Sequence, residues 1–163
     1  MARSDQIERM SHLKAIPSFF ITHTYFWGDR HYAIFMGPER AVRMSPTGDA
    51  LRCNLPFTLH NDTYVTPIDP LLLVWSAVNR LSYRGRDLGK AEQGIPVLEA
   101  LKGITINAAR QGFEEGVKGS IEPGKFADFV VLDENPLAVD PMHLKDIEIA
   151  ATIVGDVLAY GAL

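Results

Sequence analysis

The chain has 163 residues, of which 47% are hydrophobic and 22% charged, and this composition is typical of a soluble globular domain. The formal net charge of -4 and the sequence pI of about 5.7 argue against a general nucleic-acid-binding surface and against binding to an anionic membrane. No apolar run reaches the roughly 18 residues that span a bilayer, since the longest, Pro70 to Ala77, is too short. We therefore expect no nucleic-acid or membrane partner.

Cysteine usage bears on the cellular compartment. Cys53 is the only cysteine, so the chain cannot form an internal disulfide, and we expect a reducing, cytoplasmic environment. The segment Met1–Gln6 contains no apolar signal core. No neighbour of Cys53 in the sequence indicates an activated thiol, and we expect it to be inert.

A helix is predicted over residues 4–15, followed by a buried strand over residues 18–22. Asp5 can cap the helix with Glu8 in the capping-box position, and Pro17 ends it. The apolar stripe of this helix consists of Ile7, Met10 and Leu13.

Residues 23–31 are rich in histidine and aromatic side chains, and we expect them to form a loop at the end of the strand. Two interpretations are open: the loop is a binding surface, or its Tyr25, Phe26 and Trp27 pack locally. Residues 32–54 are expected to be irregular, with a short helix near Glu39–Met44 and a turn at Ser45–Asp49.

The most informative stretch is Leu55–Pro67, which predicts a strand, a polar His-Asn-Asp turn and a proline-bracketed helix start. Because side chains alternate along a strand, Phe57 and Leu59 share one face. The opposite face carries Thr58, His60 and Asp62. Such a strand suits an α/β barrel, in which strand ends deliver catalytic groups. An ordinary Asx turn explains the same residues equally well.

Two helices are predicted next, over residues 69–82 and 96–111, joined by a charged and exposed connection over residues 84–93. The first has a packing face of Leu71, Val74, Trp75, Val78 and Leu81. The second has an apolar side of Val97, Leu101, Ile104 and Ala108. The order helix, strand, helix, strand, helix predicts parallel α/β units.

The last third of the chain predicts a small β unit. Strands over residues 119–121 and 126–132 are joined by Glu122–Lys125, where Pro and then Gly fit a type II turn. A hairpin is predicted over residues 147–154 and 157–160, with Gly155-Asp156 at its turn.

Three segments resemble the amidohydrolase superfamily, and within it the family 3 branch that includes N-substituted formamide deformylases. The most specific, Lys118–Asp133, is similar to the G-S-I-x-x-G-K-x-A-D-x-V-V-L stretch near the carboxyl end of that superfamily. Leu101–Arg110 is similar to the helix that precedes this stretch. Leu55–Pro67, with its continuation to Arg80, resembles the last barrel strand and helix of the branch.

The resemblance implies a C-terminal fragment, because a complete (β/α)₈ barrel takes roughly 250 residues and the chain offers only two barrel-type strands. Residues 1–112 would supply the last strands and helices of a metal-dependent-hydrolase TIM barrel, with Phe19–Thr22 as its seventh strand and Phe57–Asp62 as its eighth. Residues 113–163 would supply the C-terminal strands of the family's β-sandwich. The H-x-H pair that members carry on the first strand does not occur in this sequence.

The resemblance also implies a reaction. Metal-activated water would attack the carbonyl of a small amide-type or formamide substrate and cleave a carbon–nitrogen bond other than a peptide bond. Asp62 would be a metal ligand and the base that takes a proton from the attacking water. The implied cofactor is a divalent metal, with zinc as the expected ion. Catalytic zinc usually takes three protein ligands, so we expect this chain alone to be inactive.

His23 and His60 are the candidate substrate-binding residues. His60 could instead orient Asp62 through a hydrogen bond or be a satisfied interior histidine. The other notable polar residues are expected to have no catalytic role: His31 and His143 on the surface, His12 on the polar side of its helix, and Lys125 and Asp128 as structural residues of the hairpin.

Two further hypotheses remain open. The chain could be a non-enzymatic accessory or binding module that retains the last quarter of a barrel. It could also form a homo-oligomer through exposed sheet edges and uncovered apolar faces.

Overall fold

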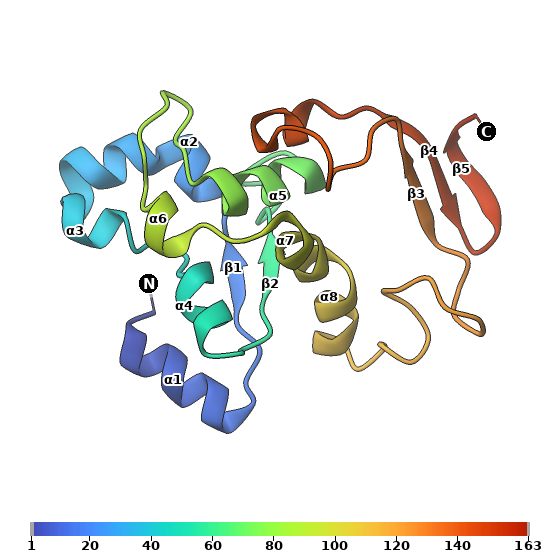
Figure 1. Ribbon diagram of the computed structural model, residues 1–163, viewed down its shortest axis with the longest axis horizontal. Helices are drawn as coiled ribbons and strands as arrows, with labels where there is room; N and C mark the ends of the chain where they lie inside the picture. Colours follow the sequence, from blue (N-terminus) through green and yellow to red (C-terminus); the bar gives the residue numbers. More distant parts are fainter. Residues whose placement is uncertain (1, 163) are drawn as a thin grey trace.

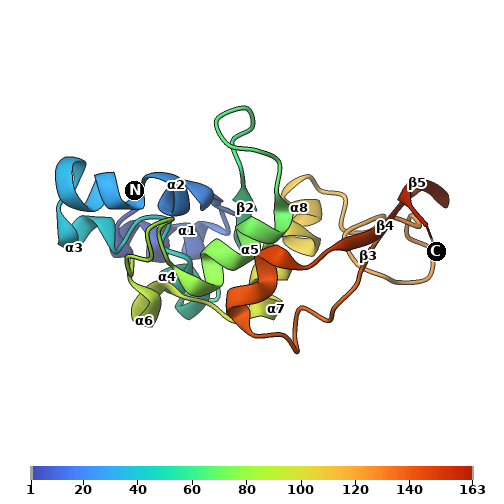
Figure 2. The same ribbon diagram turned by 90° about the horizontal axis from the view of Figure 1, so that it is seen from above.

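The computed structural model describes residues 2–162, which form helices gathered around one pair of strands and a separate three-stranded sheet (Figure 1). Figures 1 and 2 both show the three-stranded sheet at the opposite end of the molecule from α3. The fold class is therefore α/β, as the sequence predicts. Within residues 2–162, none of the helices has both the length and the apolar character to cross a membrane.

The elements follow the chain in the predicted alternation of helices and strands. The first half contains α1 (Ser4–Leu13), β1 (Ser18–Phe20), α2 (Thr22–Arg30), the π-helical turn η1 (His31–Phe35), α3 (Pro38–Ala41), α4 (Thr47–Arg52) and β2 (Thr58–His60). The second half contains α5 (Pro70–Asn79), α6 (Lys90–Gln93), α7 (Val97–Ile104), α8 (Ile106–Gln111), β3 (Phe129–Leu132), the 3₁₀-helix η2 (Pro141–Asp146), β4 (Ile149–Val154) and β5 (Val157–Gly161).

The two strands β1 and β2 pair in parallel, which confirms the arrangement expected from their order. Ser18 lies opposite Thr58, and Phe20 lies opposite His60. Parallel strands that end at matching residues have their carboxyl ends at the same edge of the sheet. The segments that follow β1 and β2 therefore leave this edge side by side and build the candidate site.

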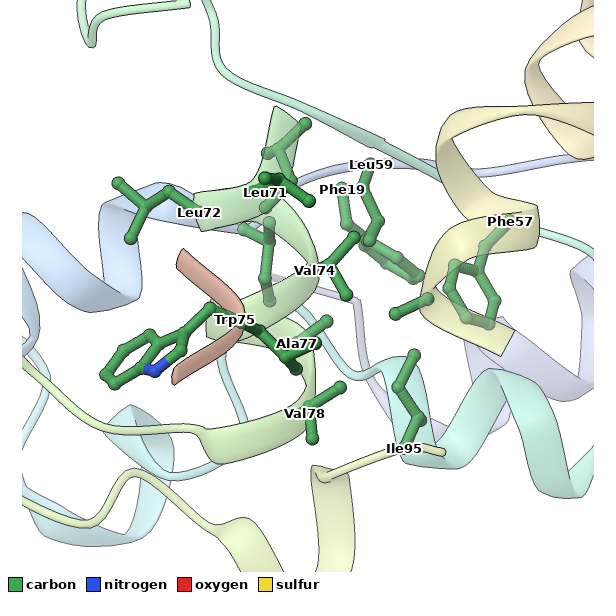
Figure 3. Packing of buried hydrophobic residues seen from close by; sticks show 14 of the residues in the cluster. Phe19, Phe57, Leu59, Leu71, Leu72, Val74, Trp75, Ala77, Val78 and Ile95 are labelled. Carbon is green, nitrogen blue, oxygen red and sulfur yellow. The ribbon is translucent and has the colours of Figure 1, made fainter. Parts of the chain in front are cut away.

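The hydrophobic core lies where α5 packs against the two strands (Figure 3). This helix begins as predicted, because Asp69 Oδ1 accepts a hydrogen bond from the Leu72 backbone nitrogen at 2.9 Å and Pro70 occupies the first turn. Every residue of α5 after Pro70 is buried, so the helix has no solvent-facing side beyond its first residue and its burial exceeds the single packing face that was predicted. Phe19 of β1, Leu59 of β2 and Phe57, which immediately precedes β2, contribute side chains to this core.

The C-terminal part is tied to the same helix. Trp75 Nε1 donates a hydrogen bond to the Met142 carbonyl oxygen at 2.9 Å, and Asn79 Nδ2 donates to the Pro141 carbonyl oxygen at 2.8 Å. These two bonds dock η2 on α5, so the chain that leads into β4 is anchored to the core.

The prediction of a loop over residues 23–31 was wrong, because these residues form α2 and the start of η1. His, Thr, Gly and aromatic residues have modest helix propensity, and tertiary packing overrides it here. The ring of Tyr25 meets that of Trp75 edge-on at 5.4 Å. A Cβ atom at Gly28 would lie 2.3 Å from Leu88 Cδ1, so the small residue lets α2 approach its neighbour closely.

The first helix begins at Ser4, as predicted, but its N-cap is Arg3 and it ends at Leu13, two residues before the predicted end. Gln6 Oε1 accepts a hydrogen bond from the Arg3 backbone nitrogen at 2.9 Å, which places the cap two residues before Asp5. The predicted stripe is buried at Ile7, whereas Leu13 is 67% exposed because the helix ends there.

The segment predicted as irregular, residues 32–54, contains most of η1 and two short α-helices. The predicted helix near Glu39–Met44 is α3, and most of the predicted turn at Ser45–Asp49 belongs to α4. The connection over residues 84–93 was predicted as exposed, but it contains α6 and two fully buried side chains, Leu88 and Gln93.

The C-terminal third is partly as predicted. The helix predicted over residues 96–111 is broken at Thr105, where φ is -125° and ψ is -99°, into α7 and α8. Residues 119–121 form no strand, because Gly119 has a φ of +92° that does not fit a strand. The strand predicted over residues 126–132 is β3, which begins at Phe129.

Both predicted turns of this region are confirmed. Gly124 has a φ of +92°, and the Lys125 backbone nitrogen donates to the Glu122 carbonyl oxygen at 3.2 Å, as in a type II turn. Gly155 and Asp156 have φ values of +56° and +68°, which suit a hairpin of type I′. The three strands β3, β4 and β5 form one antiparallel sheet in chain order.

Candidate functional site

The carboxyl ends of β1 and β2 meet at Phe20 and His60, whose rings stack with centroids 5.5 Å apart and planes 23° apart. The strand β2 ends at His60. Asp62 therefore does not continue the strand, and its predicted place on one strand face with Thr58 and His60 is wrong. Its φ is +53°, a conformation that aspartate tolerates better than most residues.

The turn that carries Asp62 is fixed at its base. The Thr66 hydroxyl donates a hydrogen bond to the Asn61 carbonyl oxygen, and the Val65 backbone nitrogen donates to the Asp62 carbonyl oxygen at 2.7 Å. Asn61 and Thr66 are buried, whereas the Asp62 side chain is exposed. Figure 2 shows the segment between β2 and α5 projecting from the body of the molecule. The carboxylate of Asp62 thus lies at the surface, on a turn whose base is buried and hydrogen-bonded.

His23 lies in the first turn of α2, immediately after β1, and both of its ring nitrogens have partners. Its Nδ1 lies 3.3 Å from His31 Nε2, and its Nε2 lies 3.1 Å from Ser45 Oγ. Burial, followed by the positive charges that His31 and Arg80 can carry, lowers the pKa of His23 to about 4. The imidazole is therefore neutral at pH 7 and acts there as a hydrogen-bonding group.

The other histidines lie as follows. His31 was predicted on the surface, but it is half-buried because η1 turns it toward His23, and burial lowers its pKa. His12 and His143 are exposed, as predicted. Sequence reasoning missed both Ser45 and His31 as members of the His23 cluster, since no motif marks either residue.

Phe20 joins the two candidate histidines, because its ring lies 5.5 Å from that of His23 as well as from that of His60. A cavity of about 680 Å³ lies beside this row of rings. Its wall includes His23 and, from the turn of Asp62, Val65. The two candidate substrate-binding residues and the candidate catalytic carboxylate thus belong to one edge of the sheet.

The side chains at this edge do not by themselves fit a resident metal ion. Among residues 2–162 there is no group of three or more His, Cys, Asp or Glu side chains placed to hold one. A catalytic zinc site usually needs three protein ligands. Asp62 offers one hard oxygen donor, so this chain can supply part of a metal site.

Within the motif Lys118–Asp133, the polar residues Asp128 and Lys125 form hydrogen bonds inside the C-terminal region. Asp128 Oδ1 accepts a hydrogen bond from the Gly155 backbone nitrogen at 2.8 Å, which ties β3 to the hairpin turn. Lys125 Nζ donates to Ser120 Oγ at 2.6 Å. Both contacts agree with the structural role predicted for these two residues.

Comparison with known proteins identifies relatives over nearly the whole chain. The family model described as "Amidohydrolase family" matches residues 1–160. A putative amidohydrolase of Bacillus subtilis (strain 168), YtcJ, is 37% identical over 103 residues, which are 61% of this chain and 19% of that protein. The N-substituted formamide deformylase of Arthrobacter pascens is 29% identical over 122 residues, which are 75% of this chain and 22% of that protein.

Solved structures show the same fold. An uncharacterized metal-dependent hydrolase from Pyrococcus horikoshii OT3 superimposes with a TM-score of 0.72 and 26% identity, and the match covers 88% of this chain and 29% of that one. An amidohydrolase from Thermotoga maritima MSB8 matches in fold with a TM-score of 0.62 and 20% identity, over 98% of this chain and 35% of that one. The chain spans about one fifth of the length of the two relatives named above.

Proposed function

The chain belongs to the amidohydrolase family, and we propose that it is the C-terminal portion of a metal-dependent hydrolase that cleaves carbon–nitrogen bonds other than peptide bonds. The observation that carries the proposal is the family match over residues 1–160. The relative named as an N-substituted formamide deformylase supports an amide-type or formamide substrate.

In this proposal the parallel pair β1 and β2 is the last quarter of a (β/α)₈ barrel, and β3, β4 and β5 belong to a β-sandwich. The boundary between the two parts lies near residue 112. Active sites of such barrels lie at the carboxyl ends of the strands. The parallel register of β1 and β2 and the position of Asp62 just after β2 support this assignment.

We assign Asp62 the roles of metal ligand and general base in the longer protein. A bound divalent cation, with zinc as the first candidate, would polarise the substrate carbonyl and acidify water. The exposed carboxylate of Asp62 can accept the proton of the attacking water, and the buried contacts of Asn61 and Thr66 hold it in place. The other ligands would come from elsewhere in the longer protein, so the isolated chain is expected to be inactive.

His23 and His60 are assigned to the substrate side of the site. The neutral imidazole of His23 lines the cavity that Val65 also borders, and His60 is linked to it through Phe20. The neutral imidazole of His23 and the neighbouring aromatic rings suit a small uncharged amide with an apolar substituent.

The upstream genomic sequence tests the proposal. We expect it to encode an H-x-H pair on a first barrel strand and further histidines at strand ends. In the longer protein, Asp62→Asn should lower kcat by about 100-fold or more, because it removes the base and weakens the ligand. The exposed change Asp133→Asn is the matched control. Flanking sequence without those histidines would refute the proposal.

Metal analysis of the isolated chain separates the proposal from the alternative of a non-enzymatic accessory module. A folded chain that binds no zinc and that has no partner segment encoded upstream would favour the accessory role. Stoichiometric zinc that is lost in Asp62→Asn would exclude it.

A further inference from the structure

Arg80 is a fully buried cation with an unusual set of partners. Its side chain is 0% exposed, and burial lowers its pKa to about 10, which still leaves it charged at pH 7. The guanidinium donates to the carbonyl oxygens of Met44 at 2.6 Å, Ser45 at 3.2 Å and Leu88 at 3.1 Å. Buried arginines are usually paired with a carboxylate, whereas these partners are all backbone groups.

The position of Arg80 makes this arrangement rigid. The residue caps the C-terminus of α5 with a φ of +55°, so its backbone is anchored to the core helix. The Leu88 backbone nitrogen donates to the Arg80 carbonyl oxygen at 2.8 Å. Leu88, in the connection between α5 and α6, is therefore bonded to both the backbone and the side chain of Arg80. One side chain thus joins the end of α5, the connection before α6 and the Met44–Ser45 segment.

Ser45 links the segment that Arg80 holds to the candidate site. Its φ is +45°, a conformation that serine rarely adopts, and its side chain is buried. Its hydroxyl has one proton, which it donates to the Phe20 carbonyl oxygen at 3.3 Å. Ser45 Oγ must therefore accept the hydrogen bond at 3.1 Å from His23, which requires the proton of His23 to be on Nε2.

The same logic extends to His31. With the proton of His23 on Nε2, its Nδ1 accepts the bond of 3.3 Å from the Nε2–H group of His31. The remaining ring nitrogen of His31, Nδ1, is buried and has no hydrogen-bond partner among the described residues. It is then a bare acceptor rather than an unpaired donor. The three hydrogen bonds are therefore donated in one direction: from His31 to His23, from His23 to Ser45, and from Ser45 to the carbonyl oxygen of Phe20 in β1.

We propose that Arg80 is a positioning residue of the candidate site, which holds the Met44–Ser45 segment so that Ser45 fixes the ring of His23 in one orientation and one tautomer. The use of that ring in substrate binding rests on the proposed function. The orientation and the tautomer do not, so the experiment below measures the imidazole itself and can fail separately from any test of hydrolysis.

The test is long-range ¹H–¹⁵N NMR of the histidine side chains in the full chain at pH 7. In the wild type we expect Nε2 of His23 to be protonated and Nδ1 not, with well-separated nitrogen resonances. Two resonances that are averaged between the tautomers, or a proton on Nδ1, would overturn the proposal without any variant.

Three variants then locate the cause. Arg80→Met removes the charge and all donors, and Arg80→Lys keeps the charge but loses the fork that reaches three carbonyls. We expect both to move the two nitrogen resonances of His23 toward a common average. Ser45→Ala should produce the same loss of separation while Arg80 stays in place. The matched control is Arg110→Met, at an exposed position of α8 that should leave His23 unchanged.

Stability alone does not decide the outcome. A folded Arg80→Met chain that has a lower melting temperature but an unchanged His23 tautomer would overturn the proposal and reduce Arg80 to a structural residue. Arg80→Lys gives the same decision about Arg80 if the methionine variant does not fold, and an unchanged His23 tautomer in Ser45→Ala would by itself overturn the role of Ser45.

Discussion

The hydroxyl oxygens of Thr22 and Thr66 lie 3.2 Å apart in the interior, where both side chains are buried. Thr66 donates its only hydroxyl proton to the Asn61 carbonyl oxygen, so Thr22 is the donor of the bond between the two threonines. This chain of two hydrogen bonds joins the first turn of α2 to the base of the turn that carries Asp62. The carboxyl ends of β1 and β2 are thereby held together by side chains as well as by strand pairing.

Thr66→Val is expected to release the turn of Asp62. Valine has nearly the same shape, but it loses both hydrogen bonds and leaves the Asn61 carbonyl oxygen unpaired in the interior. The free energy of unfolding should fall by about 1–3 kcal/mol. Urea denaturation measures the loss, and Thr63→Val, at an exposed position of the same turn, is the control. Equal stability of the two variants would contradict the role of Thr66.

Gly119→Ala and Gly124→Ala form a matched pair, because both glycines have a φ of +92°. A Cβ atom at Gly119 would lie 2.6 Å from Ala109 Cβ, whereas one at Gly124 would have no atom within 4 Å. Backbone strain should cost about 1–2 kcal/mol of unfolding free energy in both variants. Overpacking against α8 should cost Gly119→Ala a further 1–3 kcal/mol, on the order of core overpacking elsewhere. If chemical denaturation shows equal losses of unfolding free energy in the two variants, α8 moves to accommodate the added methyl group without cost.

Local signals explain why some elements could be predicted from the sequence. Asp69 and Pro70 mark the start of α5, and the apolar run after them leaves few alternatives to a buried helix. Gly155-Asp156 likewise marks the hairpin turn. The helix α2 could not be found this way, because its residues have weak intrinsic preference and its stability comes from contacts with α5 and Leu88, far along the chain.

The candidate site was likewise predicted from the sequence only in part. Family resemblance singled out Asp62 and His23, which follow strand ends that the sequence reveals, and strand alternation singled out His60, the last residue of β2. The contact between His23 and Ser45 joins residues 22 positions apart, and no periodicity or motif encodes it. The left-handed backbone of Asp62 was also missed, because strand alternation was extended two residues past the last hydrogen-bonded pair.

The stability of the chain should fall as the pH is lowered from about 6.5 to about 4. The pKa of His23 is depressed from 6.5 to about 4 in the folded state, so the unfolded chain binds more protons in this interval. Stability therefore rises with pH across the interval and is fully present above it. The contribution of His23 is at most about 3 kcal/mol, from 1.36 kcal/mol per pKa unit. The lowered pKa of His31 acts in the same direction.

Urea denaturation at pH 7.5 and pH 4.5 measures this dependence. His23→Gln should reduce the difference in unfolding free energy between the two pH values, and the same change at the exposed His143 should not. Asp49 does not confuse the result: burial raises its pKa, but Gln93 and two arginines outweigh burial and hold the pKa below 3.8. An unchanged pH dependence in His23→Gln would contradict the assignment to His23.

The chain is expected to self-associate through the free edge of β5. Among residues 2–162, β5 pairs on one side only, with β4, and the strand exposes apolar side chains at Val157 (66%), Leu158 (46%) and Tyr160 (63%). An unprotected edge of this kind can add a strand from a second copy. Analytical ultracentrifugation should show a dimer that grows with protein concentration. Leu158→Lys places a charge on the edge and should shift the dimerisation midpoint to about tenfold higher concentration, roughly 1.4 kcal/mol. Leu13→Lys, at an apolar residue of α1 that is 67% exposed, should not shift it. A monomer at all concentrations, or equal effects of the two lysines, would exclude pairing at this edge.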